Sequence, residues 1–506
     1  MQPTSPTTPA ARVPADPRRW WLLTLVAIAE LMIILDIYIV NIALPSAQSA
    51  LDMPDASRHW VVTAYAISFG GLLLLGGRIG DYWGRKRTFT LSLVGFGAAS
   101  ALGGAAWSPE LLFAARALQG VFAALMAPAI LSLLFVTFTD SRERAKAFGV
   151  WGAVAGTGSA IGLLLGGVFT EYASWRWTLL VNVPVAIALA AGAWLIVRES
   201  RAEGRTRYDV PGALTSTLGV TALVYGFTRA ESDGWGAPVT LALLAAGVAL
   251  IGLFVAIERR SSHPLLPLRV LTDRNRAGSF LANALFAGAL FSYGVFLVYY
   301  LQGSRGYSAI ESGFAIMPLA VAAIGFVSVG ARLLPRIGPR PLTVGGFAIG
   351  AVGLGWLALI GEDTSYVGVV FPGLVLLGIS AGLVWPVLSN TALVGVQPRD
   401  AGAASGMVNV SQQLGGALTV AFLNTLAASI AEGRVERDGD GALASGLIDG
   451  YAATFAVAGG LMLLGAVVSL LTIARRLPAS EQDAELPDPG PPAVAEEPVA
   501  AGARAA

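Results

Sequence analysis

Cysteine is absent from the 506 residues of this chain, and charged residues are few. The first absence excludes disulfides, thiolate metal sites and cysteine nucleophiles. Only 13% of the residues are charged and 55% are hydrophobic, whereas about a quarter of a soluble domain is charged. The net charge of +1 offers little attraction for nucleic acid. The composition therefore predicts a membrane protein that does not bind nucleic acid.

Lysine and histidine are almost missing as well. The two lysines, Lys86 and Lys146, lie outside any G-x-x-x-x-G-K-[ST] sequence, so this chain contains no P-loop for ATP. The two histidines, His59 and His263, lie near expected helix ends, and no nucleophile–base pair or metal-ligand cluster is visible. We therefore expect no enzyme, no metal site and no cofactor. Any pumping must use an ion gradient or a partner subunit.

Long apolar runs are what the sequence has in abundance. A bilayer core is about 30 Å thick and needs roughly 20 apolar helical residues to cross it. Fourteen such stretches are expected, near residues 20–45, 59–79, 88–107, 111–136, 146–169, 176–197, 210–228, 237–257, 276–302, 310–331, 341–360, 366–395, 402–428 and 449–474. The predicted fold class is an all-α membrane protein with fourteen transmembrane helices.

Lys and Arg alternate between successive loops, which tests the helix count. The N-terminus and every second loop hold clusters, such as Arg85, Lys86 and Arg87. The intervening loops hold isolated arginines at positions 58, 176, 229, 305, 434 and 437. Cytoplasmic loops carry the excess of Lys and Arg. We therefore expect a multi-pass protein of the inner (plasma) membrane with both termini in the cytoplasm.

Composition divides the chain into five parts. Residues 1–17 and 477–506 are rich in Pro, Ala, Thr or Glu, and we expect them to be disordered cytoplasmic tails. Residues 18–198 and 276–476 are each expected to form a six-helix bundle. Residues 199–275 would supply two extra linking helices with their cytoplasmic loops.

A weak internal repeat fits two related bundles. Gly149 and Gly158 in the fifth stretch are separated from Gly406 and Gly415 in the thirteenth by the same number of residues. Transporters are commonly built from such repeats, with the substrate site between them. Chance recurrence is the alternative in a chain with 61 glycines. The Gly- and Asp-rich stretch 433–447 is expected to be an exposed external loop.

Short motifs carry a family resemblance. The loop after the second stretch reads GGRIGDYWGRKRTF, the first stretch contains LDIYIVNIALP, and the fourth contains RALQGVFAA. The loop resembles the major facilitator signature G-x-L-A-D-R-x-G-R-K. The other two resemble the L-D-x-T-I-V-N-V-A-L-P run of the fourteen-helix drug:proton antiporters and the R-x-x-Q-G pattern of the superfamily. The matching loop residues are Gly77, Asp81, Gly84, Arg85 and Lys86.

A row of glycines in the stretch 146–169 adds a fourth motif. It is similar to the antiporter motif G-x8-G-x3-G-P-x-x-G-G at every glycine, but Leu163 replaces the proline. The matching residues are Gly149, Gly158, Gly162, Gly166 and Gly167. In the family the Gly-Pro step is associated with antiport as opposed to uptake. Leu163 therefore leaves both export and uptake open as directions of transport.

The resemblance covers residues 18–476 and implies the two-bundle fold with alternating access. It also implies proton-coupled efflux of lipophilic drugs or antibiotics, including cationic ones, with the proton gradient in place of a cofactor. The partners would be a small lipophilic substrate, protons and membrane lipids, and the chain would act as a monomer. The alternative is a proton-coupled transporter of a specific metabolite, in either direction.

Ionisable residues inside the apolar stretches are candidates for function, because charges in lipid are costly. At about 1.5 Å per residue, Asp36 lies about 24 Å from the start of its stretch and Arg116 about 9 Å from the opposite surface. The two residues are thus at similar levels. We predict that Asp36 carries the proton, because burial favours its neutral form and a nearby Arg116 favours its ionised form. The alternative is a fixed ion pair that only holds helices together.

Glu30 lies about 15 Å into the first stretch, near the midplane. A carboxylate there suits a cationic substrate; the alternatives are a water-facing polar residue or a second proton site. Polar and aromatic candidates for the same cavity include Asn41, Tyr299, Trp385, Asn409 and Gln412. Each of them could instead serve only in helix packing. As a set they predict a pocket that is aromatic and rich in amides.

The gate loop, residues 77–86, is expected to close the cytoplasmic side. The resemblance implies that Asp81 binds the other half of the protein, near Ala401 at the start of the thirteenth stretch. A helix N-terminus attracts anionic groups, and Gly77 would permit close approach of two helices. The alternative is that the basic residues of this loop only set the topology.

Overall fold

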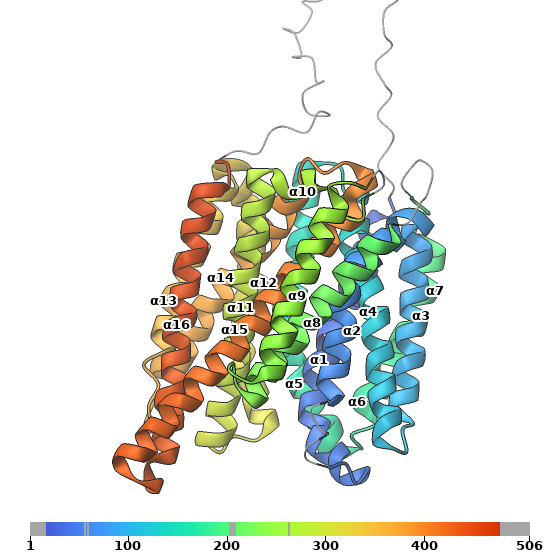
Figure 1. Ribbon diagram of the computed structural model, residues 1–506. Coiled ribbons are helices and arrows are strands. Elements are labelled where there is room, and N and C mark those ends of the chain that lie inside the picture. The colour runs from blue at the N-terminus through green and yellow to red at the C-terminus, as the bar shows by residue number, and fades with distance from the viewer. Residues whose placement is uncertain (1–16, 55–56, 58–59, 202–208, 262–263, 476–506) are drawn as a thin grey trace, which may run out of the picture.

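The computed structural model describes residues 17–54, 57, 60–201, 209–261 and 264–475. The described part is helical and contains no strand. The helices run side by side as one bundle (Figure 1). The first group is α1 (Arg19–Ala50), α2 (Trp60–Trp83), α3 (Arg85–Gly104), α4 (Pro109–Thr137), α5 (Ser141–Tyr172), α6 (Trp177–Leu180) and α7 (Asn182–Ile196). Two helices follow, α8 (Val210–Asp233) and α9 (Pro238–Glu258).

The short α10 (Leu268–Thr272) precedes a second group of long helices. This group is α11 (Arg274–Tyr299) with the π-helical turn η2 (Tyr300–Ser304), α12 (Ala309–Ile337), α13 (Pro339–Leu357), the π-helical turn η3 (Tyr366–Val370) with α14 (Phe371–Leu393), the 3-10 turn η4 (Pro398–Asp400) with α15 (Ala401–Asp438), and the 3-10 turn η5 (Asp440–Ala442) with α16 (Leu443–Thr472). Each of the fourteen expected stretches overlaps a helix of this set.

Most of these helices suit a membrane. In the described part, eleven helices are long and apolar enough to cross a bilayer by length and composition. The long helices α3, α5 and α13 are not among the eleven, yet α3 packs on α4 and α7, α5 on α1 and α12, and α13 on α14 and α16. Helices satisfy every backbone polar group within one segment, which is what a lipid environment demands.

Two groups of helices pack together through a few pairs. Within the first group α2 packs on α4 and α1 on α5, and within the second α12 packs on α14 and α11 on α15. The contacts between the groups are chiefly α5 with α12 and α14, and α15 with α2 and α4. The pair α8–α9 lies between the groups (Figure 1), where α8 contacts both α2 and α15.

The repeated glycines occupy corresponding places in the two groups. A Cβ on Gly149 would meet Val327 of α12, and one on Gly406 would meet the Leu73 carbonyl of α2. The second members, Gly158 and Gly415, face the first helices of their own groups, Ile34 of α1 and Ala284 of α11 respectively. Because the partners correspond, chance recurrence does not explain these four positions.

The prediction of a long external loop at 433–447 is wrong. Helix α15 continues to Asp438, the chain turns at Gly439 with φ +87°, and α16 begins at Leu443. Of the glycines in this stretch, Gly446 serves helix contact, because a Cβ there would lie 3.0 Å from the carbonyl oxygen of Ala431 on α15. The charges also hold the helix ends, since Arg434 lies 2.8 Å from Asp438 and 3.3 Å from Asp449.

The sixth stretch is one span with a break. A turn at Val181 separates α6 from α7, and Pro184 lacks the N–H that would continue the helical bonds across it. The two expected tails lie outside the described residues, apart from residue 17 of the first. His59 and His263 lie outside them as well.

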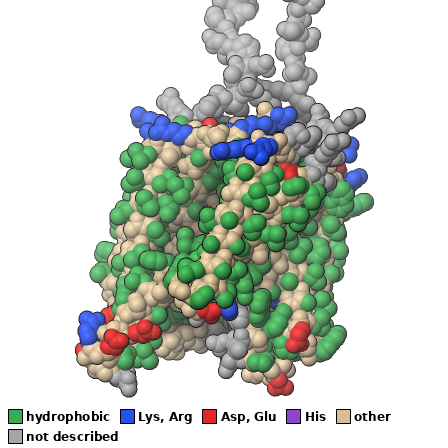
Figure 2. Space-filling model, in the orientation of Figure 1, with side chains coloured by type: hydrophobic (Ala, Val, Ile, Leu, Met, Phe, Trp, Pro, Cys, Tyr) green, Lys and Arg blue, Asp and Glu red, His purple; other side chains and the backbone are tan. Residues whose placement is uncertain are grey.

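Basic and apolar side chains occupy different parts of the surface. Lys and Arg gather at the end of the bundle where α10 lies, whereas hydrophobic side chains cover the flank of the helices (Figure 2). The exposed apolar residues of the described chain include Trp194 at 68%, Leu195 at 72% and Val321 at 68%. Such a large exposed apolar area fits contact with lipid rather than with water.

Candidate functional site

A carboxylate–guanidinium pair is buried between α1 and α4. Oδ2 of Asp36 lies 2.5 Å from Nη1 of Arg116, and the two side chains are 0% and 1% exposed. Residues that depth alone placed at similar levels thus face one another. Buried charges are strongly destabilising unless they are paired, so each residue requires the other while both are ionised.

Neutral polar groups complete the surroundings of Asp36. Gln119 Nε2 and Asn182 Nδ2 donate to Asp36 Oδ1 at 2.8 and 2.9 Å. Gln119 also accepts from Arg116 at 2.8 Å and donates to Ser100 Oγ at 2.8 Å. Side chains of α4 and α7 therefore bind the carboxylate of α1, and Ser100 of α3 joins them through Gln119. We call these residues the Asp36 cluster.

The guanidinium of Arg116 has partners besides Asp36. Its Nε donates to the carbonyl oxygen of Val61 at 2.9 Å, and its charge lies 4.5 Å from the centre of the buried Tyr65 ring. Both contacts come from α2. Arg116 would therefore keep two uncharged acceptors, Val61 and Gln119, and one aromatic face if Asp36 became neutral. The arrangement is compatible with a carboxylate that gains and loses a proton.

Glu30 is a second buried carboxyl group on α1, with 8% exposure. It lies near the indole of Trp151 on α5, although no hydrogen bond of ordinary geometry reaches Trp151 Nε1 among the described residues. The next residue of α5, Gly152, lies against Pro386 of α14, because a Cβ there would be 2.6 Å from the proline ring. Glu30 is thus placed close to the contact between the two helix groups.

The second group supplies aromatic and amide side chains to this contact. Trp385 precedes Pro386 on α14, is 7% exposed, and meets Phe286 of α11 edge to face at 5.8 Å. Its Nε1 has no hydrogen-bond partner in the part of the chain that the structure describes. Gln412 of α15 donates to Asn283 of α11 at 3.5 Å. A buried indole N–H without a partner marks a place that a ligand acceptor could fill.

Three predicted pocket residues have different outcomes. Asn409 lies one turn before Gln412 and donates to the Ser405 carbonyl of its own helix at 3.0 Å. Tyr299 is 48% exposed and packs on Tyr451 of α16 at 6.4 Å. It lies about 20 Å along α11 from Phe286, so the structure does not bring it to Trp385. The side chain of Asn41 lies outside the described residues.

The gate loop contacts the start of α15. The backbone N–H of Gly402 donates to both carboxylate oxygens of Asp81, at 3.0 Å each. A Cβ on Gly77 would lie 2.2 Å from the Gly402 carbonyl oxygen, so only glycine permits this approach of α2 and α15. Arg85 lies 2.8 Å from Asp81 and also donates to Ser132 at 2.6 Å.

The remaining gate-loop residues hold the first group together. Gly84 has φ +118°, a conformation that favours glycine, and a Cβ there would collide with Glu199. Lys86 donates through Nζ to the Trp194 carbonyl at 2.6 Å, and Glu199 accepts from the backbone N–H of Lys86 at 3.2 Å. Unlike Asp81, these residues make no contact with the second group among the contacts just described.

The glycine row of α5 forms the contact with α1. A Cβ on Gly158 would meet Ile34, one on Gly162 would meet Tyr38 at 3.0 Å, and one on Gly166 would meet Ile39 at 3.2 Å. Gly167 is buried, and the side chain of Leu163 lies outside the described residues. The row therefore places α5 against the helix that carries Glu30 and Asp36. Gly149, the first of the motif, faces α12 instead.

The sequence interpretation missed several polar groups. Gln119 is the glutamine of RALQG and lies one turn from Arg116, so the motif itself held the signal. Ser100 and Tyr65 had no signal, because small hydroxyls and aromatics are common in apolar helices. Arg78 and Asp400 are only 3% and 4% exposed where α2 meets the start of α15, and they escaped notice because they lie at expected helix ends.

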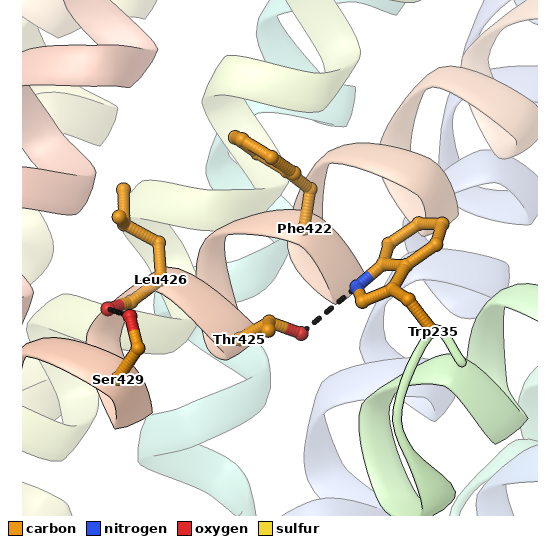
Figure 3. Close-up of a pocket in the computed structure, with 5 residues that line it drawn as sticks. All are labelled: Trp235, Phe422, Thr425, Leu426 and Ser429. Carbon is orange, nitrogen blue, oxygen red and sulfur yellow. Dashed lines mark hydrogen bonds between the residues drawn. The ribbon is translucent and has the colours of Figure 1, made fainter. Parts of the chain in front are cut away.

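A cavity of about 450 Å³ lies away from all of these residues. It is lined by Trp235, Phe422, Thr425, Leu426 and Ser429, none of which was predicted as a site residue (Figure 3). The Trp235 indole N–H donates to Thr425 Oγ1 at 3.0 Å, which ties the turn between α8 and α9 to α15. The lining is mostly apolar and carries no charged residue.

The apolar helices and the charges buried among them are typical of a polytopic helical transporter. A model of the Major Facilitator Superfamily matches residues 26–420. The puromycin resistance protein pur8 of Streptomyces alboniger is 46% identical over 94% of this chain and 96% of its own length. The cephamycin export protein CmcT of Amycolatopsis lactamdurans is 39% identical over 80% of this chain and 85% of its own.

A solved structure is similar in fold. It is that of the human organic anion transporter MFSD10 (TETRAN), with a TM-score of 0.61 and 16% identity over 90% of this chain and 99% of that chain. The matching model covers most of the chain, and both relatives exceed 30% identity over most of its length. The chain belongs to the Major Facilitator Superfamily.

Proposed function

We propose that this chain exports a lipophilic drug or antibiotic, including cationic compounds, in exchange for protons. The relatives support export, because they include proteins named for puromycin resistance, cephamycin export and lincomycin resistance. The proton gradient is the proposed energy source, because the sequence has no P-loop. The substrate is a small molecule, and the proposed working unit is a single chain in contact with lipid.

The proposed topology has fourteen transmembrane helices. Eleven described helices meet the length and hydropathy required of a span, and we add α3, α5 and α13 because they pack among those eleven. Residues 18–198 and 276–476 form the two six-helix bundles, joined by residues 199–275. The gathering of Lys and Arg at one end supports a cytoplasmic location for that end and for both termini in the inner membrane (Figure 2).

The observation that carries the proton-coupling proposal is the Asp36 cluster. A buried carboxylate is paired with a guanidinium at 2.5 Å, and that guanidinium has neutral partners of its own. Protonation of Asp36 from outside would weaken its bond to Arg116 without leaving Arg116 unpartnered. Release of the proton inside would restore the pair. A pair that alternates in this way can couple proton movement to a conformational change.

The Asp81–Gly402 contact supports the proposed alternating access. It joins α2 to the N-terminus of α15 on the proposed cytoplasmic side, and the side chain of Asp81 is 0% exposed. We assign the described conformation to the state that is closed toward the cytoplasm. Opening toward the cytoplasm requires this contact to break, so Asp81 is the proposed latch.

The proposed substrate region lies between Glu30 and Trp385. Glu30 supplies a negative charge in a place of low dielectric, where it would attract a cationic substrate. Trp151, Trp385 and Phe286 supply aromatic faces that suit lipophilic and cationic compounds. Gln412 and Asn283 add amide groups for hydrogen bonds. Tyr299 is not included, since it lies at another level of α11.

Drug accumulation tests the function. We expect cells expressing this chain to accumulate less puromycin or lincomycin than control cells, and a protonophore should abolish the difference. Persistence of the difference after the gradient collapses would contradict proton coupling. Equal accumulation of every lipophilic and cationic compound tried, together with gradient-dependent movement of one metabolite, would favour the alternative of a specific metabolite transporter.

The role of Glu30 has its own test. In Glu30→Gln we expect the apparent affinity for a cationic drug to fall while the affinity for a neutral drug stays near the wild-type value. Competition between the two drug classes in membrane vesicles measures both affinities. Unchanged affinity for both classes would remove Glu30 from the substrate site.

A further inference from the structure

The segment between α9 and α11 contains a strap, defined here as residues 264–273, which is tied to α2, α9 and α15. Three of its apolar side chains are buried: Leu265 at 3%, Leu266 at 1% and Val270 at 2% exposure. A connection between two long helices with this degree of burial is unusual, because connecting segments generally run over the surface. The strap therefore behaves as part of the packed protein rather than as a flexible link.

Arg78 of α2 binds the strap directly. Its Nε donates to the Leu265 carbonyl at 2.5 Å, and its Nη2 donates to the Pro264 carbonyl at 2.7 Å. Its Nη1 reaches the Arg399 carbonyl at 3.2 Å and Asp400 at 3.4 Å. The Arg78 side chain is 3% exposed, so this cation depends on the strap and on the start of α15 for most of its partners.

Glu258 fixes the same stretch of the strap from the other side. Its two carboxylate oxygens accept from the backbone N–H groups of Leu265 and Leu266 at 3.0 and 3.1 Å. Glu258 is the last residue of α9 and is 4% exposed. The backbone at Leu265 is thus held between a carboxylate of α9, which binds its N–H, and a guanidinium of α2, which binds its carbonyl.

A third contact ties the strap to α15. Arg269 Nη2 lies 2.5 Å from Oδ2 of Asp400, while Oδ1 of Asp400 faces Arg78 at 3.4 Å. Asp400 immediately precedes α15, two residues before the Gly402 that binds Asp81. The strap, Arg78 and Asp400 therefore surround the place where the gate loop meets the second group of helices.

We propose that the strap is a second cytoplasmic latch, with Arg78, Glu258 and Arg269 as positioning residues that hold it closed. This inference rests on the proposed alternating-access function. Separation of α2 from α15 must remove Arg78 from Pro264, Leu265 and Asp400 as well as Asp81 from Gly402. The extra pair α8–α9 thereby acts on the conformational equilibrium, because Glu258 joins α9 to the segment that Arg78 must release.

Distances between spin labels test the proposal in the full chain. The sequence contains no cysteine, so label pairs can be introduced into the otherwise unchanged protein: Arg198→Cys with Arg336→Cys on the cytoplasmic side, and Trp107→Cys with Val367→Cys on the external side. The label positions are exposed. Double electron–electron resonance then gives the fractions of cytoplasm-open and cytoplasm-closed molecules without requiring a substrate.

We expect Arg78→Gln to raise the ratio of open to closed molecules by about tenfold, because two charge-assisted hydrogen bonds to the strap are lost. Glu258→Gln should raise it by about threefold, since a neutral amide offers only one acceptor to two backbone N–H groups. Arg269→Gln should move it in the same direction. Arg87→Gln is the matched control, because Arg87 is 59% exposed and faces Glu199 within the first group.

A second readout separates positioning from general damage. Variants that favour the open state should change the apparent KM for export and the maximal rate by different factors, with the melting temperature near the wild-type value. A change in the ratio of open to closed molecules in Arg78→Gln alone, with the ratio unchanged in Glu258→Gln and Arg269→Gln, would contradict the role of the strap. Arg78 would then act only through Asp81 and Asp400. Unchanged populations in all three variants would contradict that role as well. A wild-type chain that changes conformation but exports no drug would instead contradict the proposed function.

Discussion

The two groups of helices differ in the kind of polar side chain that they bury. In α1–α7 the buried residues include Glu30, Asp36 and Arg116 within the apolar stretches. Within the apolar stretches of the described α11–α16 no charged side chain is buried, since the buried Asp400 precedes α15, and amides and hydroxyls such as those of Asn283 and Gln412 take that place. Charge is therefore concentrated in one half of a protein whose two halves otherwise correspond.

This difference separates two tasks that a coupled exporter must perform. A proton site needs an ionisable group whose charge has a partner, which the Asp36 cluster provides. A pocket for varied lipophilic compounds needs aromatic faces and adaptable hydrogen bonds without a fixed strong charge. Glu30 is the one carboxylate near the contact of the two halves that the proposed substrate region uses. Variants in either half can therefore test whether proton coupling and substrate binding are separated in this way.

The largest expected effect follows removal of Arg116. Arg116→Leu leaves Asp36 buried without its cation, and we expect a loss of about 3–5 kcal/mol in stability. Adding Asp36→Asn to the same chain should recover much of that loss, because the uncompensated charge is gone. Thermal unfolding of the purified single and double variants measures the effect. Equal destabilisation in both variants would mean that the charge pairing is not what stabilises this region.

The second effect concerns the contact between α2 and α15. Gly77→Val adds atoms where a Cβ would lie 2.2 Å from the Gly402 carbonyl, and overpacking of this kind is destabilising by about 1–3 kcal/mol. Only the cytoplasm-closed state should suffer, so the cytoplasm-open fraction should increase. Gly80→Ala is the control, because a Cβ there meets nothing within 4 Å. An unchanged ratio in Gly77→Val would contradict the assignment of this contact to the closed state.

A smaller effect is expected in the amide-rich half. Gln412→Leu removes a hydrogen bond to Asn283 that is long, at 3.5 Å, so stability should fall by no more than about 1 kcal/mol. Trp385→Phe keeps an aromatic face but removes the indole N–H. We expect a few-fold change in apparent affinity for some drugs and none in the proton dependence of export. A lost proton dependence in either variant would show that coupling is not confined to the first half.

The smallest expected effect lies at the turn between the extra helices α8 and α9. Trp235→Phe removes the hydrogen bond to Thr425 at a partly exposed place (Figure 3). We expect at most about 1 kcal/mol of destabilisation and export close to that of the wild type, because this cavity lies apart from the Asp36 cluster and the gate loop. Vesicle uptake compared with a melting curve checks both statements. A complete loss of export would place the cavity on the transport route.

Much of the helical fold followed from the sequence because lipid imposes a simple rule. Apolar runs of membrane length form helices, and each of the expected stretches overlaps a helix of the described structure. The depth of Asp36 and Arg116 placed them at one level, and the resemblance pointed Asp81 to the start of α15, where Gly402 now binds it. The family model confirms the predicted superfamily.

What failed depended on contacts between distant residues. The glycines and acids at 433–447 were predicted to form a loop, but Gly446 packs α16 against α15 and Asp438 pairs with Arg434. Tyr299 was grouped with Trp385 by residue type alone, although about 20 Å of helix separates their levels. The strap had no local signal, because its partners Arg78 and Asp400 are far away in sequence and look like ordinary charges at helix ends.

The central claim is that Asp36 couples export to protons, and one comparison in proteoliposomes tests it most directly. Wild-type protein should move drug in response to an imposed pH gradient and should also exchange labelled for unlabelled drug without any gradient. Asp36→Asn should lose the gradient-driven movement and keep the exchange, because the substrate region and both latches are intact. Gradient-driven transport at the wild-type rate in Asp36→Asn would contradict the account and leave the Asp36–Arg116 pair as a structural bond between α1 and α4.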